Sequence, residues 1–353
     1  MRILTVVGNR PQFIKAAAVS GPLREHHSEL LVHTGQHHDD SLSRIFFSEL
    51  GLSSPDRELA IAGGSNTSQT ARMLGALEPL LTDEAPDAVL VYGDTNSTLA
   101  GALAAAQAGI PVMHIEAGMR SFDRRMPEEL NRVLTDHLSA LLLCSSETAA
   151  ENLARESVAG RVILVGDVMV DVARRWQPAA REDTAVSAAH GLMPGCYLLL
   201  TAHRAGNVDD PARLGALVEL IEALPEPVLF PMHPRTRARL SESGLMARIE
   251  AAEVIVTPPL GYAEFSALLC QARAVVTDSG GVQKEAYLAG VPCVTLRANT
   301  EWVETVETGW NTLVDLDPAA ALAALDARPP AEHPQLYGDG RAAERCVEAI
   351  GQL

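Results

Sequence analysis

Acidic residues gather in one short stretch of the chain, residues 114–132, which reads HIEAGMRSFDRRMPEELNR. Glu116 ends an apolar run expected to be a strand, and Asp94 ends the apolar run before it. Glu128 and Glu129 follow directly on a proline, a residue favoured in the first turn of a helix. Because crowded carboxylates cannot all stay ionised cheaply, such a cluster can supply a general acid beside a general base.

Each of these acids also has a structural interpretation. An acid at a helix start commonly caps the helix or interacts favourably with its dipole. We favour that interpretation for Glu129. For Asp94 and Glu116 we favour a functional role, because ligands of open α/β sheets bind beyond the carboxyl ends of the strands.

The elements that would position these acids alternate regularly along the chain. Short apolar runs such as ILTVV, AVLVY, VMHIE and VILVG are each followed by a helical pattern. This alternation predicts an α/β protein whose parallel sheets are covered by helices. A polar stretch rich in Pro and Ala, residues 176–195, interrupts it, and 353 residues are too many for one typical core. We therefore expect two domains, 1–174 and 175–338, with a last helix at 339–353 that packs back on the first.

Composition excludes several classes of partner. The net charge of -17 argues against a surface for nucleic acid or for an anionic membrane. We find no signal peptide and no apolar run of the ~18 residues that a membrane span needs. The 5 cysteines show no CxxC spacing, which indicates buried free thiols in a reducing cytoplasm. The first strand-to-helix turn, GNRPQFIK, lacks the glycine fingerprint of a dinucleotide site.

The strongest phosphate signal is the run AVVTDSGGVQKEA, residues 274–286. A strand leads into Ser279, Gly280 and Gly281, and a helix begins just after them. Free amide groups at such a helix start bind anions, and Glu285 lies one turn further along, within reach of a ribose hydroxyl. The alternative is a tight turn in which Glu285 interacts with the helix dipole.

Three basic or titratable residues stand at other strand tips. Arg10 and Lys15 open the first helix, where they suit a phosphate or are solvated surface charges. His203 ends the strand CYLLLTAHR, and it suits either proton transfer or phosphate binding. Its alternative is a histidine bonded only to backbone.

Taken together, these motifs resemble those of the non-hydrolysing UDP-N-acetylglucosamine 2-epimerases. The matching segments, in chain order, are GNRPQFIK, HTGQH, YGDTNST, HIEAGMRSFDRRMPEELNR, GDVMVD, TAHR, DSGGVQKEA and TEWVE. They span both expected domains. The resemblance implies a GT-B-like fold, in which two Rossmann-like domains face each other across a cleft that holds a UDP-sugar. It also implies a cytoplasmic homodimer that uses no metal and no cofactor.

The resemblance implies a reaction as well, the interconversion of UDP-GlcNAc and UDP-ManNAc for polysaccharide biosynthesis. The C2 proton is removed, UDP leaves C1 to give a 2-acetamidoglucal, and UDP re-adds while a proton reaches the other face of C2. The implied catalytic residues are Asp94, Glu116, Glu128 and His203. The implied substrate-binding residues are Arg10, Ser279, Gly280 and Gly281 for the phosphates, Glu285 for the ribose, Phe265 for the uracil, and Lys15 in support.

Two departures from the family pattern bear on function. Gly206 stands where many members have a glutamate, so a loop contact is missing or is replaced by Asn207. Members activated by their own substrate carry charged and amide-rich residues at 61–68 and a glutamine-rich helix at 38–45, where this chain reads IAGGSNTS and HDDSLSRI. We therefore predict that allosteric activation by UDP-GlcNAc is weak or absent.

Other functions remain open from the sequence alone. An epimerase for a modified sugar, such as a UDP-diacetamido-hexuronic acid, would need a cation for the extra carboxylate, and Arg120, Arg124 or Arg125 is available. A GT-B glycosyltransferase predicts an acceptor groove and no need for three carboxylates. A nucleotide-sugar binding protein predicts UDP affinity without turnover.

Overall fold

The computed structural model describes residues 1–36 and 49–353. It consists of two compact units, one of Met1–Arg174 with Gln335–Leu353 and one of Arg175–Pro334. The boundary lies within helix α7 (Val168–Glu182). The chain rejoins the first unit at Gln335, before the expected residue 339, because Tyr337 is 1% exposed and its carbonyl accepts the Asp167 amide hydrogen at 2.9 Å.

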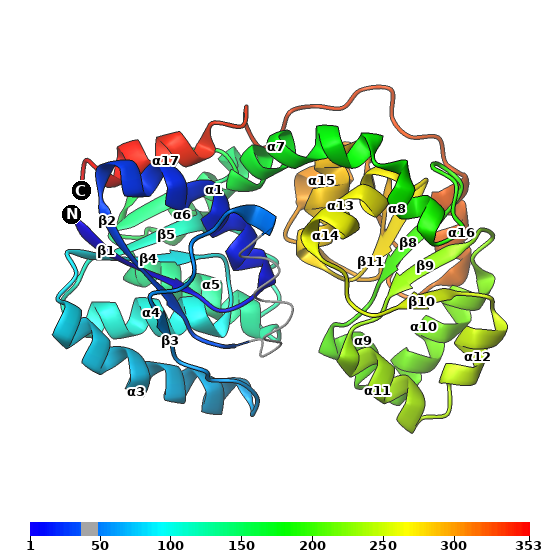
Figure 1. Cartoon of the computed structure of the whole chain (residues 1–353), viewed down its shortest axis with the longest axis horizontal. Coiled ribbons are helices and arrows are strands. Elements are labelled where there is room, and N and C mark those ends of the chain that lie inside the picture. Colours follow the sequence, from blue (N-terminus) through cyan, green and yellow to red (C-terminus); the bar gives the residue numbers. More distant parts are fainter. Residues whose placement is uncertain (37–48) are drawn as a thin grey trace. The chain divides into compact units, whose positions relative to one another are not determined.

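The first unit is built on a seven-stranded sheet whose neighbouring strands all pair in parallel. Helices α1 and α17 cover one face, and α3, α4 and α5 cover the other (Figure 1). In sheet order, the strands are β3 (Arg57–Glu58), β2 (Ser28–His33), β1 (Arg2–Val7), β4 (Ala88–Tyr92), β5 (Val112–Ala117), β6 (Leu141–Cys144) and β7 (Arg161–Leu164). The helices are α1 (Arg10–His26), α3 (Asn66–Glu84), α4 (Asn96–Gln107), α5 (Pro127–Leu138), α6 (Glu147–Glu156) and α17 (Ala342–Ile350).

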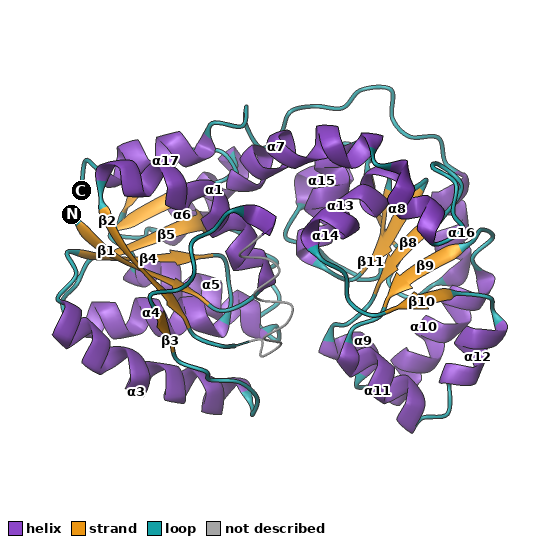
Figure 2. Ribbon diagram, viewed as in Figure 1, coloured by secondary structure: helices purple, strands orange, loops and turns teal. Residues whose placement is uncertain are grey.

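The second unit repeats the plan on a six-stranded parallel sheet (Figure 2). In sheet order, its strands are β10 (Ile255–Thr257), β9 (Val228–Pro231), β8 (Leu198–Thr201), β11 (Ala274–Thr277), β12 (Cys293–Thr295) and β13 (Asn311–Leu313). Its helices are α8 (Thr184–Ala189), α9 (Ala205–Val208), α10 (Pro211–Ala223), α11 (Pro234–Glu242), α12 (Met246–Ala251), α13 (Tyr262–Gln271), α14 (Gly280–Ala289), α15 (Val303–Glu307) and α16 (Pro318–Asp326).

The central strands are apolar throughout because helices cover both of their faces. Every residue of β4 and of β8 is buried, as the continuous runs AVLVY and LLLT predict for a parallel sheet. In the second unit, one apolar cluster joins β8 to α10 and α16, and another joins it to α13 and α14. Such packing leaves the carboxyl ends of the strands as the edge where polar side chains collect.

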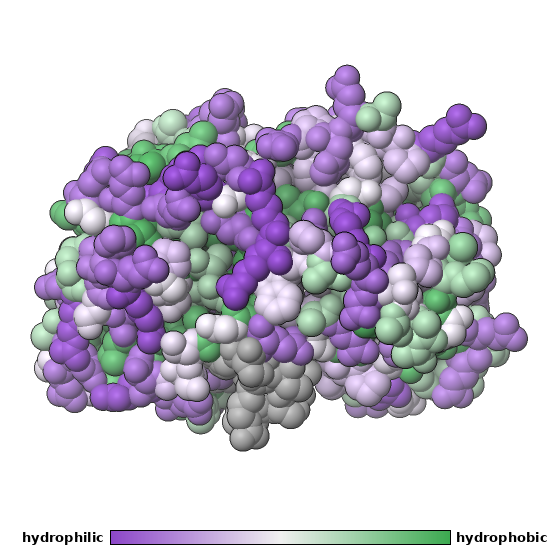
Figure 3. Space-filling model, turned by 45° about the horizontal axis from the view of Figure 1, so that its top comes forward, coloured by the Kyte–Doolittle hydropathy of each residue, from purple (hydrophilic) through white to green (hydrophobic). Residues whose placement is uncertain are grey.

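The cysteines of the chain are all reduced thiols. All 5 cysteines are free, and Cys144, Cys293 and Cys346 are buried as expected, whereas Cys196 is exposed because it lies in the turn before β8. Within residues 1–36 and 49–353, no helix is both long enough and apolar enough to span a membrane. The face drawn in Figure 3 carries polar side chains interspersed with small apolar areas.

Candidate active site

Glu116 lies at the carboxyl end of β5 in an unusual backbone conformation. Its φ of +70° is left-handed, and the β5–β6 register shifts between Ile115 and Ala117. Non-glycine residues held in this region are costly, and they cluster at functional sites. The carboxylate forms an ion pair with Lys15 of α1, and both side chains are at least 90% buried. The ion pair offsets the cost of burying either charge alone.

Gly93, just beyond β4, has no side chain, and the Lys15–Glu116 ion pair packs against it. Its φ is +61°, and a Cβ placed there would lie 3.1 Å from Glu116 Oε2 and 3.1 Å from Lys15 Nζ. A side chain at this position would therefore press on both charged groups. The turn at Gly93 places the next residue, Asp94, beside the same pair.

Asp94 is held by one arginine and remains partly open. Arg132 Nε and Nη2 donate to Asp94 Oδ2 at 3.0 and 2.6 Å, and Asn131 Nδ2 donates to the Asp94 carbonyl at 2.9 Å. The Asp94 side chain is 32% exposed, and its Oδ1 has no hydrogen-bond partner among the described residues. One oxygen is thus fixed and the other is available to a ligand.

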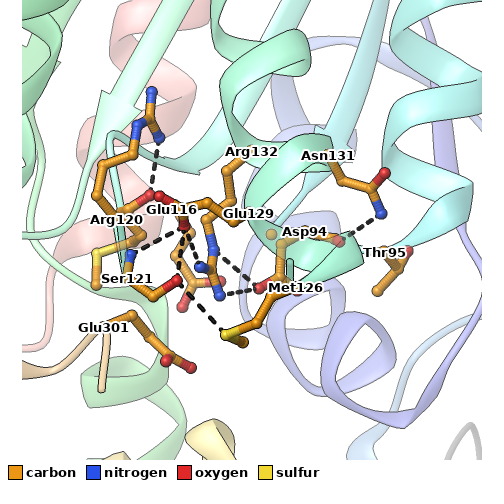
Figure 4. A network of polar contacts seen from close by, with 12 residues as sticks. Asp94, Thr95, Glu116, Arg120, Ser121, Met126, Glu129, Asn131, Arg132 and Glu301 are labelled. Carbon is orange, nitrogen blue, oxygen red and sulfur yellow. Dashed lines mark hydrogen bonds and ion pairs between the residues drawn. The ribbon is translucent and has the colours of Figure 1, made fainter. Parts of the chain in front are cut away.

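Helix α5 turns charged residues, not apolar ones, toward the interior. Leu130 and Leu134 are 47% and 50% exposed. The buried residues of the helix are Glu129, Asn131, Arg132, Thr135 and Asp136. This inversion shows that α5 serves as a polar brace for the strand tips, and Figure 4 shows its contacts with Asp94 and the loop at Ser121.

Glu129 is part of that brace: it lies in the first turn of α5 as expected, but its carboxylate binds the loop at Ser121. It accepts hydrogen bonds from the amides of Ser121 and Phe122, each at 2.9 Å, and from Arg132 Nη1 at 2.7 Å. Burial opposes its charge, but the amide of Ser121 and the charge of Arg132 hold the pKa of Glu129 below its usual value. Glu129 is therefore an ionised structural group that fixes the loop.

Glu128, its neighbour, is placed differently. It lies in the first turn of α5 and is half-buried. Among the residues that the structure describes, its carboxylate has no hydrogen-bond or ion-pair partner. The first unit thus brings together Asp94, Glu116 and Lys15, with Glu128 on the same helix that holds Asp94. Arg10, the first residue of α1, is half-buried.

In the second unit, β11 leads directly into the helix start expected to bind phosphate. Helix α14 begins at Gly280, and a Cβ added at Gly281 would meet no atom within 4 Å. The Ser279 amide donates to Thr277 Oγ1 at 2.9 Å, while the Ser279 hydroxyl has no recorded partner among the described residues. Glu301 Oε1 lies 2.1 Å from the position of a Cβ on Gly280, so only glycine fits beside that carboxylate.

Asp278 holds this helix start to the tip of β8. It is fully buried and accepts hydrogen bonds from the amides of His203 and Arg204 at 3.0 and 2.9 Å. Asn207 Nδ2 donates to it at 3.2 Å and to the Leu296 carbonyl at 3.0 Å. Asn207 is therefore a buried residue that joins Asp278 to the Leu296 carbonyl.

The remaining expected ligands of the second unit differ in exposure. His203 is 41% exposed, and its ring centroid lies 5.6 Å from that of His233. Glu285 is half-buried on α14. Phe265 is 3% exposed within an apolar cluster of the second unit. Sequence reasoning missed Lys284, which is 1% exposed with Nζ 4.1 Å from the centroid of the Trp302 ring.

The stretches compared with substrate-activated relatives are only partly described. Residues 38–45 lie outside the described ranges. In residues 61–68, Ser65 caps α3 by accepting the Ser68 amide at 3.2 Å, and Arg72 Nη2 donates to the Ala62 carbonyl at 3.1 Å. These contacts give the second stretch a structural role.

Asp278→Ala is expected to destabilise the second unit by about 2–4 kcal/mol, because the amides of His203 and Arg204 lose the carboxylate that accepts from them. The same change should weaken UDP binding, since the His203 loop loses its anchor. Urea unfolding and calorimetric titration with UDP measure the two effects. Asp326→Ala, at the exposed end of α16, is the matched control. An Asp278 variant as stable as that control would refute the bracing role.

The fold of the chain is similar to that of known enzymes. A crystal structure of the Methanocaldococcus jannaschii UDP-GlcNAc 2-epimerase in complex with UDP-GlcNAc and UDP superposes with a TM-score of 0.93 at 40% identity, covering 100% of both chains. A Neisseria meningitidis UDP-GlcNAc 2-epimerase bound to UDP-GlcNAc gives a TM-score of 0.86 at 29% identity, covering 100% of both chains. The two Rossmann-like units therefore have the fold of the GT-B-like epimerases, which confirms the expected fold class.

Sequence comparison narrows the class to a family. The family model described as UDP-N-acetylglucosamine 2-epimerase matches residues 23–351. A Pseudomonas aeruginosa UDP-2,3-diacetamido-2,3-dideoxy-D-glucuronate 2-epimerase is 46% identical over 365 residues, covering 100% of both chains. The chain belongs to the UDP-N-acetylglucosamine 2-epimerase family, as its motifs predicted.

Proposed function

We propose that this protein is a non-hydrolysing 2-epimerase that interconverts UDP-GlcNAc and UDP-ManNAc. The observation that carries the proposal is the set of carboxylates in the first unit. Glu116 is neutralised by buried Lys15, Asp94 keeps one oxygen open beside Arg132, and Glu128 has no described partner. Epimerisation needs acid and base groups on opposite faces of one carbon, so several carboxylates in different electrostatic environments suit it better than one base.

The proposed reaction conserves atoms and electrons. A carboxylate takes the C2 proton, the C–H electron pair forms the C1–C2 double bond, and the C1–O bond breaks so that UDP leaves with its electron pair. A UDP oxygen then adds back to C1 while a carboxylic acid delivers a proton to the other face of C2. Asp94, Glu116 and Glu128 act together as the acid and base groups of this proposal.

The second unit is proposed to hold the leaving UDP. Ser279, Gly280 and Gly281 offer amides and a hydroxyl at the positive end of α14, and His203 lies at the tip of the adjacent strand. Glu285 would bind the ribose, Arg10 would bind the phosphates, and Lys15 would support the site through its ion pair with Glu116. Fixed donors at the departing diphosphate stabilise the charge that develops there.

Incubation with UDP-GlcNAc in deuterated water tests this function. The proposal expects deuterium at C2, together with NMR signals of UDP-ManNAc. Free UDP with free ManNAc would instead indicate a hydrolysing enzyme. No exchange at C2, with UDP still bound, would indicate a glycosyltransferase, a binding protein or an enzyme for another sugar.

A second candidate substrate is favoured by the 46% identical Pseudomonas relative, whose name specifies a diacetamido-glucuronate. A uronate requires a cation for its carboxylate. Arg120 is buried and paired with Asp136 and Glu156, and Arg125 is paired with Asp123. Arg124 is exposed and has no partner among the described residues, so it is the arginine that remains available.

If the uronate is the substrate, Arg124→Ala should raise its KM by about 10-fold or more, the usual loss for one charge-assisted contact. Steady-state kinetics with both UDP-sugars measure this effect. Arg125→Ala is the matched control, since its side chain is already paired within the loop. Equal KM values for the uronate in wild type and Arg124→Ala would exclude Arg124 as the cation.

A further inference from the structure

His114, in the middle of β5, is completely buried. It lies on β5, two residues before Glu116, and both of its ring nitrogens contact oxygen atoms. Nδ1 lies 2.7 Å from Asp136 Oδ1, and Nε2 lies 2.8 Å from the Gly93 carbonyl oxygen. The ring therefore links α5 to the turn that carries Asp94.

The two contacts fix the number of protons in this group. A peptide carbonyl oxygen only accepts, so Nε2 must carry a hydrogen. A neutral imidazole would then present a bare Nδ1 to Asp136, which is a repulsion between two acceptors. A second proton on Nδ1 removes this repulsion, and it makes the ring an imidazolium paired with a carboxylate.

The charges around the ring support that state. Asp136 also accepts from Arg120 Nη1 at 2.7 Å and from the Gly118 amide at 3.1 Å. Arg120 is in turn paired with Glu156 at 2.7 Å. Burial opposes the charge of Asp136, but the facing His114 and Arg120 hold its pKa below the usual value.

The other neighbours do not offset this arrangement. Cys144 of β6 stays a neutral thiol, since burial raises its pKa to about 12. On the far side of Gly93, Lys15 and Glu116 neutralise each other. His114, Asp136, Arg120 and Glu156 thus form a network of two cations and two carboxylates, and His137 Nε2 lies 3.5 Å from Glu156 at its outer end.

The Gly93 peptide connects this network to Asp94, the next residue along the chain. Its carbonyl accepts from His114, its amide donates to the Ile115 carbonyl at 3.0 Å, and its φ is +61°. The next residue is Asp94, whose own carbonyl is held by Asn131. This peptide leads directly into Asp94, whose carboxylate accepts from Arg132.

We propose that His114 is a positioning residue, held as an imidazolium between Asp136 and the Gly93 carbonyl, that sets the direction of the Asp94 carboxylate. The proposal rests on the proposed role of Asp94 in proton transfer. A hydrophobic residue would fill the same core position without the cost of a buried charge, whereas this ion pair holds the Gly93 carbonyl in one direction. His114 itself does not touch the substrate.

The protonation state is tested without any assay of activity. In uniformly 15N-labelled protein, His114 is expected to show two one-bond N–H correlations, one at each ring nitrogen. The signals are assigned by their absence in His114→Gln. A single ring N–H at His114 in folded wild-type protein would overturn the proposal, whether or not the protein turns over UDP-GlcNAc.

Two matched variants test the positioning role. Glutamine places its amide nitrogen near the position of Nε2 and can still donate to Gly93, whereas asparagine places its amide near Nδ1 and cannot reach it. His114→Asn is expected to lower kcat for C2 exchange by about 10-fold or more with KM within about twofold, the pattern of a misplaced catalytic group. His114→Gln should retain most of kcat.

Each kinetic outcome decides a different point. Equal loss of kcat in His114→Asn and His114→Gln would overturn the link through Gly93, and a rise in KM alone would show a role in binding. If wild type itself lacks C2 exchange, the proposed function fails, but the NMR result still decides the state of His114. If His114→Asn does not fold, the wild-type spectrum remains the decisive measurement.

Discussion

Asp94→Asn is expected to lower kcat by about 10²-fold or more, the usual contribution of a general acid or base, while the Kd for UDP changes by less than about twofold. Asparagine keeps the shape of the side chain and an oxygen for Arg132, whose two bonds reach Asp94 Oδ2. It removes the group that exchanges a proton. Deuterium incorporation at C2, followed by NMR, measures kcat, and calorimetry measures UDP binding.

The control for this prediction is Asp83→Asn, an exposed acid near the end of α3. It makes the same chemical change away from the strand tips and is expected to leave kcat unaltered. Wild-type rates of C2 exchange in Asp94→Asn would remove Asp94 from the mechanism. Loss of UDP affinity in step with kcat would show that Asp94 supports binding, not proton transfer.

Arg132→Met is expected to lower the free energy of unfolding of the first unit by about 3–5 kcal/mol, the usual cost of removing one partner from a buried ion pair. Arg132 is 3% exposed and pairs with both Glu129 and Asp94. Methionine fills much of the volume but leaves the Glu129 carboxylate, 2% exposed, without its cation. The melting temperature of that unit should fall by roughly 6–15 °C.

Arg155→Met provides the comparison for this stability effect. Arg155 pairs with Glu151 on the surface of α6, where the two side chains are 70% and 64% exposed. Exposed pairs of this kind contribute about 0–1 kcal/mol. A difference of less than about 1 kcal/mol between the two variants, measured by urea unfolding, would show that the α5 brace is not a main support of the first unit.

The sequence predicted the fold well because the fold depends on short-range patterns. Continuous apolar runs such as AVLVY specify strands covered on both faces, and their alternation with helices specifies parallel sheets. The same logic placed Asp94, Glu116 and Ser279 at strand tips. These predictions need only the identity of neighbouring residues along the chain.

The bracing contacts could not be predicted in the same way, since they join residues far apart in sequence. Lys15 and Glu116 are 101 residues apart, and Arg132 and Asp94 are 38 apart. One local signal was available. Glu129, Arg132 and Asp136 recur on one face of α5. This spacing in the sequence indicates a helix with a charged face, and that face is the buried one.

Phe265 shows what a family motif leaves out. The resemblance implies packing against uracil, and the structure adds that the side chain is 3% exposed among apolar neighbours of α13 and β8. A motif gives the identity of a residue but not the exposed fraction of its side chain, which depends on how tightly the surrounding helices pack. His114 illustrates the reverse case, because its importance appears only from the two oxygens that face it.

The most direct test of the account follows the C1–O bond of the sugar. UDP-GlcNAc is prepared with 18O in the oxygen between C1 and the β-phosphorus, and incubated with the protein in deuterated water. Elimination and re-addition of UDP predicts that recovered UDP-sugar carries deuterium at C2 and that 18O has spread to the non-bridging β-phosphate oxygens, visible by 31P NMR. Deuterium at C2 with all of the 18O still in the bridge would show that the C1–O bond never breaks, and it would contradict the proposed mechanism.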